Sequence, residues 1–294
     1  MGRLHIPGLI DVVRESSAAR IDAIARDPRF DRDYRAEGPL LNRMIVRNLR
    51  GALALDGVPL PPVAPHGGER PLPAQAALAA RLDAAADAGP SASDLVALAN
   101  YVRGEGRETD AGMLVQRVTG ALFDPDYRAD PQSWSDARVL AAAPSTLNPL
   151  RRIAWAITGR IAKARRRLAA KVGNDPSALH GTGVAIHNLE AALRKLRALY
   201  ADPEDRGRLS PQAATGTALT APRQVLRQPV SATQLDGANL ARSTLIVLQL
   251  EQANARDPGY DTAFMSGNWA ECPARRWVPT LLSAVWAKAT EAAP

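Results

Sequence analysis

The segment FMSGNWAECP, from Phe264 to Pro273, together with the apolar stretch behind it, decides the fold prediction. Cys272 is the only cysteine in the chain of 294 residues, which excludes a disulfide scaffold and a cysteine-rich zinc site. Pro273 suits a first helical turn, so the sequence predicts a helix from Pro273 to about residue 292, with Pro279 as a point where it kinks or starts late. A thiolate is stabilised near a helix N-terminus, and Cys272 has that placement.

The residues ahead of this segment follow a recognisable order. Going along the chain, they are Ala221-Pro222, Arg227, Leu235-Asp236-Gly237, the apolar run 244–247 and the stretch ANARDP at 253–258. Together with Phe264, Gly267 and Cys272, this order resembles the C-terminal part of the haem-thiolate cytochrome P-450 family. The chain resembles a shortened and divergent member of that family.

The resemblance implies a site and a fold. It implies haem as cofactor, with Cys272 as the axial thiolate ligand of the haem iron and Arg227 paired with a haem propionate. Phe264 would lie against the sulfur side of the ring, and Gly267 would permit the tight turn of the loop. The fold implied, together with the helical patterns below, is mainly α: a multi-helix single domain with a small β element near residues 225–250.

Several positions depart from the family pattern. Phe264 and Cys272 are eight positions apart where the family has seven, and Ala270 stands where the family has a basic residue. The stretch 212–218 replaces the Glu-x-x-Arg motif, and the acid–alcohol pair that handles protons on oxygen is not evident. We therefore predict a haem enzyme, an oxidoreductase or isomerase, that uses peroxide or an oxidised, lipid-like molecule instead of performing ordinary hydroxylation.

The positive charge is concentrated in one segment. The net charge is +7, and residues 147–173 hold eight Lys and Arg and no acid, so the rest of the chain is close to neutral. Apolar residues in this segment recur at helical spacing, at Ile153, Ile157, Ile161, Ala164, Leu168 and Val172. The segment predicts one amphipathic basic helix.

The basic helix leaves alternatives open. It is a solvated surface helix, or it contacts an acidic protein partner or an anionic membrane surface through Arg165, Arg166 and Arg167. The alternative function is accordingly a non-catalytic helical interaction protein on a degenerate haem-thiolate fold. No helix-turn-helix or base-reading pattern indicates a specific nucleic-acid partner. Residues 1–26 lack an apolar signal core, and no long apolar run is present, so the expected location is cytoplasmic.

Periodicity predicts the remaining organisation. We divide the chain into a helical segment 1–55, a Pro/Gly-rich linker or covering segment 56–73, and a helical domain 74–294 that includes the haem-thiolate-like region 221–294. Helices are expected over 9–26, 40–55, 74–88, about 95–102 with Ser91 or Ser93 as cap, 109–123, 132–143 and 177–200. His180 and His187 lie two turns apart on the last of these, which suggests a metal or bis-imidazole haem role without identifying its other partners.

Overall fold

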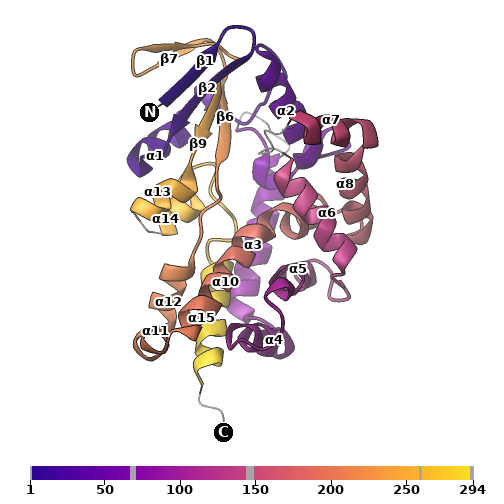
Figure 1. The fold of residues 1–294 in the computed structure, drawn as a ribbon, viewed down its shortest axis with the longest axis vertical. Helices are drawn as coiled ribbons and strands as arrows, with labels where there is room; N and C mark the ends of the chain where they lie inside the picture. Colours follow the sequence, from indigo (N-terminus) through magenta and orange to yellow (C-terminus); the bar gives the residue numbers. More distant parts are fainter. Residues whose placement is uncertain (1, 67–70, 144–148, 258–259, 292–294) are drawn as a thin grey trace.

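The computed structural model describes residues 2–66, 71–143, 149–257 and 260–291. Helices predominate, and a small sheet lies at one end of the molecule (Figure 1). The mainly α fold with a β element near residues 225–250 is therefore confirmed. In the part of the chain described, no helix is long and apolar enough to cross a membrane.

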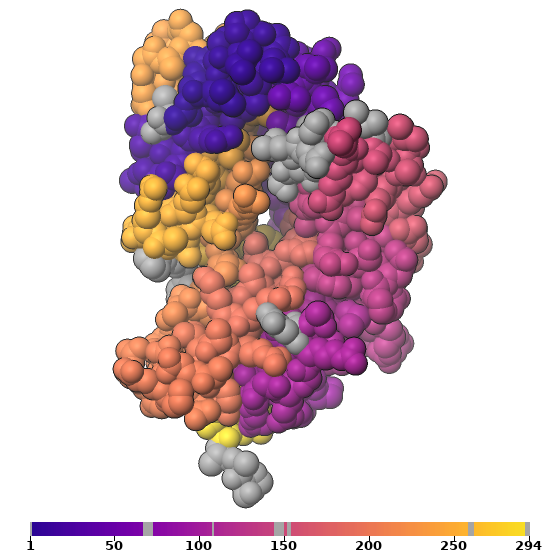
Figure 2. Space-filling view, in the orientation of Figure 1, coloured from indigo at the N-terminus to yellow at the C-terminus, as the bar shows by residue number. Residues whose placement is uncertain are grey.

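The principal sheet joins the two ends of the chain. Its strand order is β1-β2-β9-β6-β3, and β2 and β9 run parallel, with Val12 opposite Leu245. The indigo N-terminal residues and the orange residues of the C-terminal strands accordingly lie together at one end of the molecule (Figure 2). The sheet strands are β1 (Gly2–Ile6), β2 (Ile10–Glu15), β3 (Phe30–Asp31), β6 (Val225–Pro229) and β9 (Leu245–Leu248). Two hairpins pair β4 (Ala54–Leu55) with β5 (Val58–Pro59) and β7 (Thr233–Leu235) with β8 (Ala238–Leu240).

The helices that precede residue 172 are short to medium in length. They are α1 (Ala18–Arg26), α2 (Leu40–Leu53), α3 (Pro71–Ala88), α4 (Ala92–Val102), α5 (Ala111–Ala121), α6 (Pro131–Ala142), α7 (Pro149–Thr158) and α8 (Arg160–Lys171). Ser91 caps α4 as predicted, because its side chain accepts a hydrogen bond from the Asp94 amide.

The chain after Lys171 forms one long helical unit, which is followed by shorter helices and the final helix. That unit is α9 (Pro176–His180), a π-helical turn (Gly181–Ala185) and α10 (Ile186–Ala201). It is followed by α11 (Pro203–Arg208), α12 (Pro211–Ala218), α13 (Leu250–Arg256), α14 (Tyr260–Phe264) and α15 (Trp277–Thr290).

Three sequence predictions need correction. The helix expected over 9–26 is strand β2 followed by α1, so the segment 1–55 is not wholly helical. The basic helix expected over 147–173 is two helices, which meet at Gly159 with φ +61°, and residues 147–148 lie outside the described residues. The last helix starts at Trp277 and not at Pro273, so that Pro279 falls in its first turn, where its missing N–H breaks no helical hydrogen bond.

The hydrophobic core is continuous between the sheet end and the helices. A large cluster joins Val13 and Phe30 to the buried faces of α4, α5, α10 and α15, and Trp286 lies fully buried within it. A smaller cluster fills the space between the sheet and α2 and contains Val12, Val46, Leu226 and Leu245. The Pro/Gly-rich segment 56–73 also contributes, because Leu60 and Ala64 are fully buried; residues 67–70 of that segment lie outside the described part.

Candidate functional site

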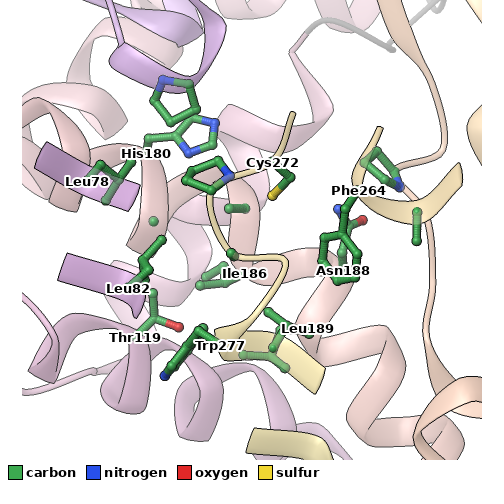
Figure 3. A pocket seen from close by; sticks show the side chains of 18 of the residues that line it. Leu78, Leu82, Thr119, His180, Ile186, Asn188, Leu189, Phe264, Cys272 and Trp277 are labelled. Atoms are coloured by element: carbon green, nitrogen blue, oxygen red, sulfur yellow. The ribbon is translucent and has the colours of Figure 1, made fainter. Parts of the chain in front are cut away.

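A mostly apolar cavity with a free volume of about 100 Å³ lies between α3, the α9–α10 unit and the loop that leads into α15. That volume is below the usual range for small-molecule sites, so a larger ligand requires the cavity walls to move apart. Leu78 and Leu82 approach from α3, and Ile186 and Leu189 from α10 (Figure 3). The described residues that line the cavity include no Asp or Glu. The polar side chains among them are Thr119, Ser177, His180, Asn188, Thr220 and Cys272.

The loop that carries Cys272 is closed on itself. The Cys272 amide donates to the Phe264 carbonyl oxygen at 2.8 Å, which joins the two ends of the loop. The loop turns back through Met265 and Gly267, whose φ angles are +51° and +73°. Gly267 thus occupies a tight turn, and the left-handed conformation suits glycine.

The Cys272 thiol sits in a poorly solvated place. Burial raises the pKa of the Cys272 thiol above its ordinary value, while the Ala274 N–H and the positive charge of Arg32 act in the opposite direction. The N–H groups of the turn before α15 are thus close to the sulfur, although the helix itself begins later than predicted. Burial therefore favours the protonated thiol, and a metal cation bound to the sulfur would favour the thiolate.

His180 lines the same cavity, from the end of α9. Burial, together with the charge of Arg32, lowers the pKa of His180 to about 4, so the imidazole is neutral at pH 7. Figure 3 shows the His180 ring and the Cys272 side chain at the same end of the cavity. Two potential metal ligands of different chemistry therefore share one apolar space.

Arg227 and Arg32 are buried next to this end of the cavity. Arg227, on β6, is fully buried, and its Nη1 donates to the Leu226 carbonyl oxygen at 2.8 Å. Its Nε and Nη2 have no hydrogen-bond partner among the residues that the structure describes. Arg32 donates from Nη2 to the Ala270 carbonyl oxygen at 3.2 Å and from Nη1 to that of Pro62. Burial and the neighbouring charge of Arg227 lower the pKa of Arg32 to about 9, so Arg32 is still protonated at pH 7.

Trp269 connects the two arginines. Its ring centroid lies 5.0 Å from the guanidinium carbon of Arg32, 5.1 Å from that of Arg227 and 4.9 Å from the ring of His66. The indole Nε1–H is buried, and no acceptor for it lies in the described part of the chain. Asp31 attracts both guanidiniums, but its Oδ1 accepts from the backbone N–H groups of Arg32 and His66. This cluster, Arg32, Arg227 and Trp269, is the "cationic cluster" below.

The cationic cluster has more buried donors than acceptors. Among the described residues, the Nε and Nη2 nitrogens of Arg227 and the Nε1 nitrogen of Trp269 have no hydrogen-bond partner, and an unpartnered buried donor costs about 1–3 kcal/mol. A ligand with carboxylates would satisfy these donors and neutralise the charge. The donor set therefore fits an anionic group bound against the cationic cluster.

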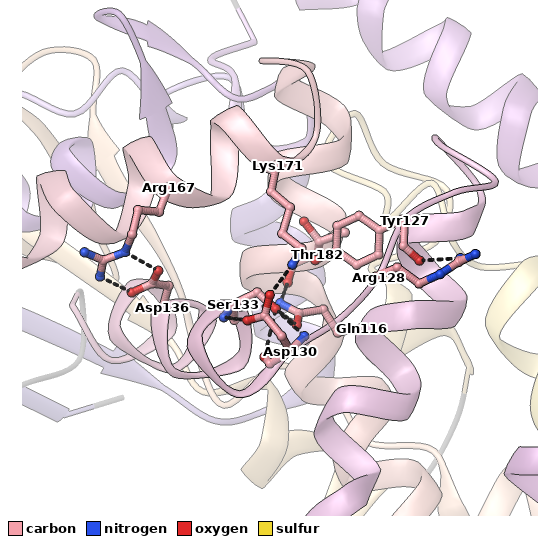
Figure 4. Close-up of polar contacts among 9 residues, drawn as sticks. All are labelled: Gln116, Tyr127, Arg128, Asp130, Ser133, Asp136, Arg167, Lys171 and Thr182. Atoms are coloured by element: carbon pink, nitrogen blue, oxygen red, sulfur yellow. Dashed lines mark hydrogen bonds and ion pairs between the residues drawn. The ribbon is translucent and has the colours of Figure 1, made fainter.

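A buried polar network holds the π-helical turn beside His180 (Figure 4). Gln116, on α5, is fully buried and donates to the carbonyl oxygens of Thr182 at 3.0 Å and Ser133 at 3.2 Å. The Ser133 hydroxyl returns a hydrogen bond to Gln116 Oε1 at 2.8 Å. These contacts fix the turn where the regular helical hydrogen-bond pattern is interrupted.

The structure places the predicted site residues in two groups. Phe264 and Cys272 line the cavity, and Arg227 lies next to it through the cationic cluster. Gly267 faces a second hollow, beside Arg26 of α1. His180 and His187 do not form a pair: His187 stacks on Trp134 with ring centroids 5.0 Å apart.

Arg32 and Trp269 were not among the predicted cofactor-binding residues, and His180 was considered only as a partner of His187. Arg32 comes from a distant part of the chain and brings its positive charge to the carbonyl of Ala270, where the family pattern has a basic residue. No local pattern connects the two positions.

Two of the three arginines proposed for partner contact are bound within the chain. Arg165 donates to the carbonyl oxygens of Gly51 at 2.9 Å and Ala54 at 3.0 Å, at the end of α2. Arg167 forms an ion pair with Asp136 on α6 at 2.5 Å, and Arg166 is exposed. Arg165 and Arg167 therefore fasten α8 to its neighbours.

No protein-family model matches the sequence, and no curated protein matches it either. Solved structures do match. A six-coordinated cytochrome P450 from Thermus thermophilus superposes with a TM-score of 0.60 and 15% identity, over 95% of this chain and 84% of that one. The chain has a cytochrome P450 fold.

Two further cytochrome P450 structures show the same likeness. Cytochrome P450 CREJ, in complex with (4-ethylphenyl) dihydrogen phosphate, gives a TM-score of 0.61 at 14% identity and covers 95% of this chain and 83% of that one. Cytochrome P450EX alpha with myristic acid gives 0.58 at 11% identity and covers 94% and 80%. These similarities extend over nearly the whole chain, so the P450 fold includes the N-terminal strands as well as the region 221–294.

Proposed function

We propose that the cavity binds haem, with Cys272 as thiolate ligand of the iron and the cationic cluster holding the propionates. The observation that carries this proposal is the coincidence of a thiol, an apolar cavity and three buried donors without acceptors. A propionate on Arg227 and the Trp269 indole would remove these unpaired donors, and Arg32 adds a second cation. Arg32 here replaces the basic residue that the family pattern has at position 270.

Two groups around Cys272 favour ionisation of its thiol. The Ala274 N–H and Arg32 favour the ionised sulfur against the cost of burial. The Phe264 carbonyl oxygen accepts a hydrogen bond from the Cys272 amide, which closes the loop that carries the sulfur, and the buried Phe264 side chain lines the same cavity. When bound, haem supplies redox chemistry at the iron, tuned by the thiolate.

The cavity wall favours peroxide or an oxidised lipid as the oxidant. None of the described lining residues is an acid that could deliver protons to bound dioxygen. A peroxide already carries its oxygen atoms and both oxidising equivalents, so it does not need this proton relay. The apolar lining suits a lipid-like substrate, and one solved structure of the same fold was obtained with myristic acid.

Hemin titration of the purified protein tests haem binding. We expect stoichiometric uptake and, after reduction and addition of carbon monoxide, the long-wavelength Soret band of a thiolate-ligated iron. Cys272→Ala should take up hemin through the cationic cluster but lose that band, and Ser266→Ala, in the same loop, should behave as the wild type. A protein that takes up no hemin would overturn the proposal and leave the non-catalytic interaction protein as the function to test.

Oxygen-transfer assays test the oxidant. The hemin-loaded protein is given a fatty acid with hydrogen peroxide, or with dioxygen and a chemical reductant. Products formed with peroxide alone support the proposal, whereas turnover only with dioxygen and reductant contradicts it.

A further inference from the structure

Two large aliphatic side chains on α7 point away from the protein. Leu150 is 76% exposed and Ile157 is 81% exposed, which are the highest exposed fractions among the large hydrophobic side chains that the structure describes. They are seven positions apart, with the exposed Ala154 between them, so they lie along one face of the helix. A single exposed aliphatic residue is ordinary, but a row of them on one helix face indicates a contact surface.

The opposite side of α7 attaches the helix to the protein. Trp155 is only 5% exposed and belongs to the main hydrophobic core. The guanidinium carbon of Arg151 lies over its ring, 4.6 Å from the centroid. Helices α7 and α8 lie side by side at the outer edge of the molecule (Figure 1). One face of α7 is thus anchored, and the face with Leu150 and Ile157 is presented to the outside.

The exposed surface that follows this aliphatic row is positively charged. Arg160 and Lys163, in the first turn of α8, are exposed, and neither forms an ion pair in the part of the chain that the structure describes. Asp136, on the neighbouring helix α6, is already paired with Arg167. None of the exposed residues described between 150 and 170 is acidic. Since Arg165 and Arg167 are engaged within the chain, the free positive charge lies at the first turn of α8.

This combination fits an anionic lipid surface. Leu150 and Ile157 project from a helix, and the acyl boundary of a bilayer accepts such side chains without a pocket of matching shape. The unpaired bases beside them complement the phosphates of anionic headgroups, to which each base near the surface adds attraction. Aliphatic residues on one side of a helix and bases beside them are typical of helices that lie in a membrane interface.

We propose that α7 and the first turn of α8 form a docking surface for an anionic lipid membrane. Leu150 and Ile157 enter the boundary between headgroups and acyl chains, while Arg160 and Lys163 contact the headgroup phosphates. The protein binds at the membrane surface and does not cross it. This inference goes beyond the proposed function, and it does not depend on haem.

Vesicle co-sedimentation of the purified full chain, without added hemin, tests the docking surface. One vesicle contains phosphatidylcholine and phosphatidylglycerol in equal parts, and the other contains phosphatidylcholine alone. We expect the wild type to bind the anionic vesicle, to bind it less as the salt concentration rises, and to leave the neutral vesicle unbound. A wild type that binds neither vesicle, or both equally, would overturn the proposal; binding to neither would leave an acidic protein as the occupant to test.

The aliphatic row is tested by the double variant Leu150→Ser/Ile157→Ser. Its partition into anionic vesicles should fall by about tenfold or more, because two side chains no longer enter the apolar region. Val96→Ser, which changes an exposed aliphatic residue on α4, is the control and should bind as the wild type does. Equal losses in the double variant and in the control would contradict the assignment.

The charged part is tested by Arg160→Glu/Lys163→Glu, whose partition should also fall by about tenfold or more. Both acids would stand in the first turn of a helix, where negative charge is favourable, so the fold tolerates them. Lys195→Glu/Arg223→Glu changes two other exposed bases and gives the same net charge. If this control loses as much binding, the attraction is diffuse and the docking surface is wrong.

Hydrogen exchange of the wild type makes the test independent of the variants' folding. The exchange of backbone amides is followed by mass spectrometry with and without anionic vesicles. We expect slower exchange in α7 and in the first turn of α8 when vesicles are present, and unchanged exchange in α4. Bound protein without protection in α7 would refute the docking surface.

Discussion

Arg32 and Arg227 are two cations buried against the same indole ring, at 5.0 and 5.1 Å from the ring centroid of Trp269. Arg32 directly follows β3 and Arg227 lies on β6, so the two residues are far apart in the sequence. Each adds a positive charge that the surrounding protein only partly balances. A folded protein retains such an arrangement at a stability cost, which suggests that the cations are kept for binding.

The first prediction concerns Arg227→Met. Without haem, this variant should be more stable than the wild type by about 1–3 kcal/mol, because an apolar side chain replaces a buried, incompletely paired charge. Its affinity for hemin should fall by about tenfold or more, since a charge-assisted contact to a propionate is lost. Denaturant unfolding of the apo-protein and hemin titration measure the two effects. Arg166→Met, at an exposed position, is the control, and a less stable variant with unchanged hemin affinity would contradict the prediction.

The second prediction concerns the polar network beside the π-helical turn. Gln116→Leu should lower the free energy of unfolding by about 1–3 kcal/mol, because the Thr182 and Ser133 carbonyls lose their buried donor. Gln132→Leu removes a hydrogen bond to Asp136 from an exposed glutamine and should cost less than about 0.5 kcal/mol. Equal losses in the two variants would argue against a special role for Gln116.

The third prediction compares two helical glycines. A Cβ at Gly112 would lie 2.2 Å from the Trp134 ring, so Gly112→Ala should destabilise the protein by about 1–3 kcal/mol. A Cβ at Gly216, in α12, meets nothing within 4 Å, so Gly216→Ala should stabilise by about 0.5–1 kcal/mol. Thermal and denaturant unfolding of both variants should give changes of opposite sign.

The fourth prediction concerns acid stability through Asp11 on β2. Burial raises the pKa of this carboxyl, but the hydrogen bonds from Arg3 and from the Thr244 hydroxyl lower it by more than burial raises it. The net pKa of Asp11 is therefore below its ordinary value of 3.8. The stabilisation it gives is therefore complete above about pH 4 and is lost as the pH falls through the lowered pKa.

Asp11→Asn should accordingly lower the free energy of unfolding by about 1–3 kcal/mol at pH 7 and reduce the further loss below pH 4. Asp126→Asn, at an exposed carboxyl, serves as control and should leave the acid transition unchanged. An Asp11→Asn variant with wild-type stability at pH 7 would refute this account.

Sequence patterns predicted most helices but misassigned the first one. Val12 and Val13 fit a helical stripe, yet these two β-branched residues pair with β9 in a sheet. That partner lies at the other end of the chain, and a local pattern cannot reveal it. The break at Gly159 was missed for a related reason: the charge pattern continues across the break, while Ile157 is left 81% exposed.

The candidate site was predictable where it depends on local order and not where it depends on tertiary contacts. Phe264 and Cys272 could be placed in the same loop from their spacing, and the structure puts both on the cavity wall. Their role toward haem stays a prediction. Arg32 could not be foreseen, because no sequence pattern relates it to Ala270, whose carbonyl it contacts.

Because β2 pairs with β9 near the other end of the chain, β2 is synthesised long before its neighbouring strand. Val12 leaves the ribosome about 230 residues before its partner Leu245, which at about 5–20 residues per second leaves β2 without this neighbour for roughly 10–50 seconds. During that interval β2 is an apolar edge with unpaired backbone groups, which is the kind of segment that chaperones cover and that aggregates when they do not. The yield of native protein in a cell should therefore depend on translation speed and chaperone supply more than its final stability suggests.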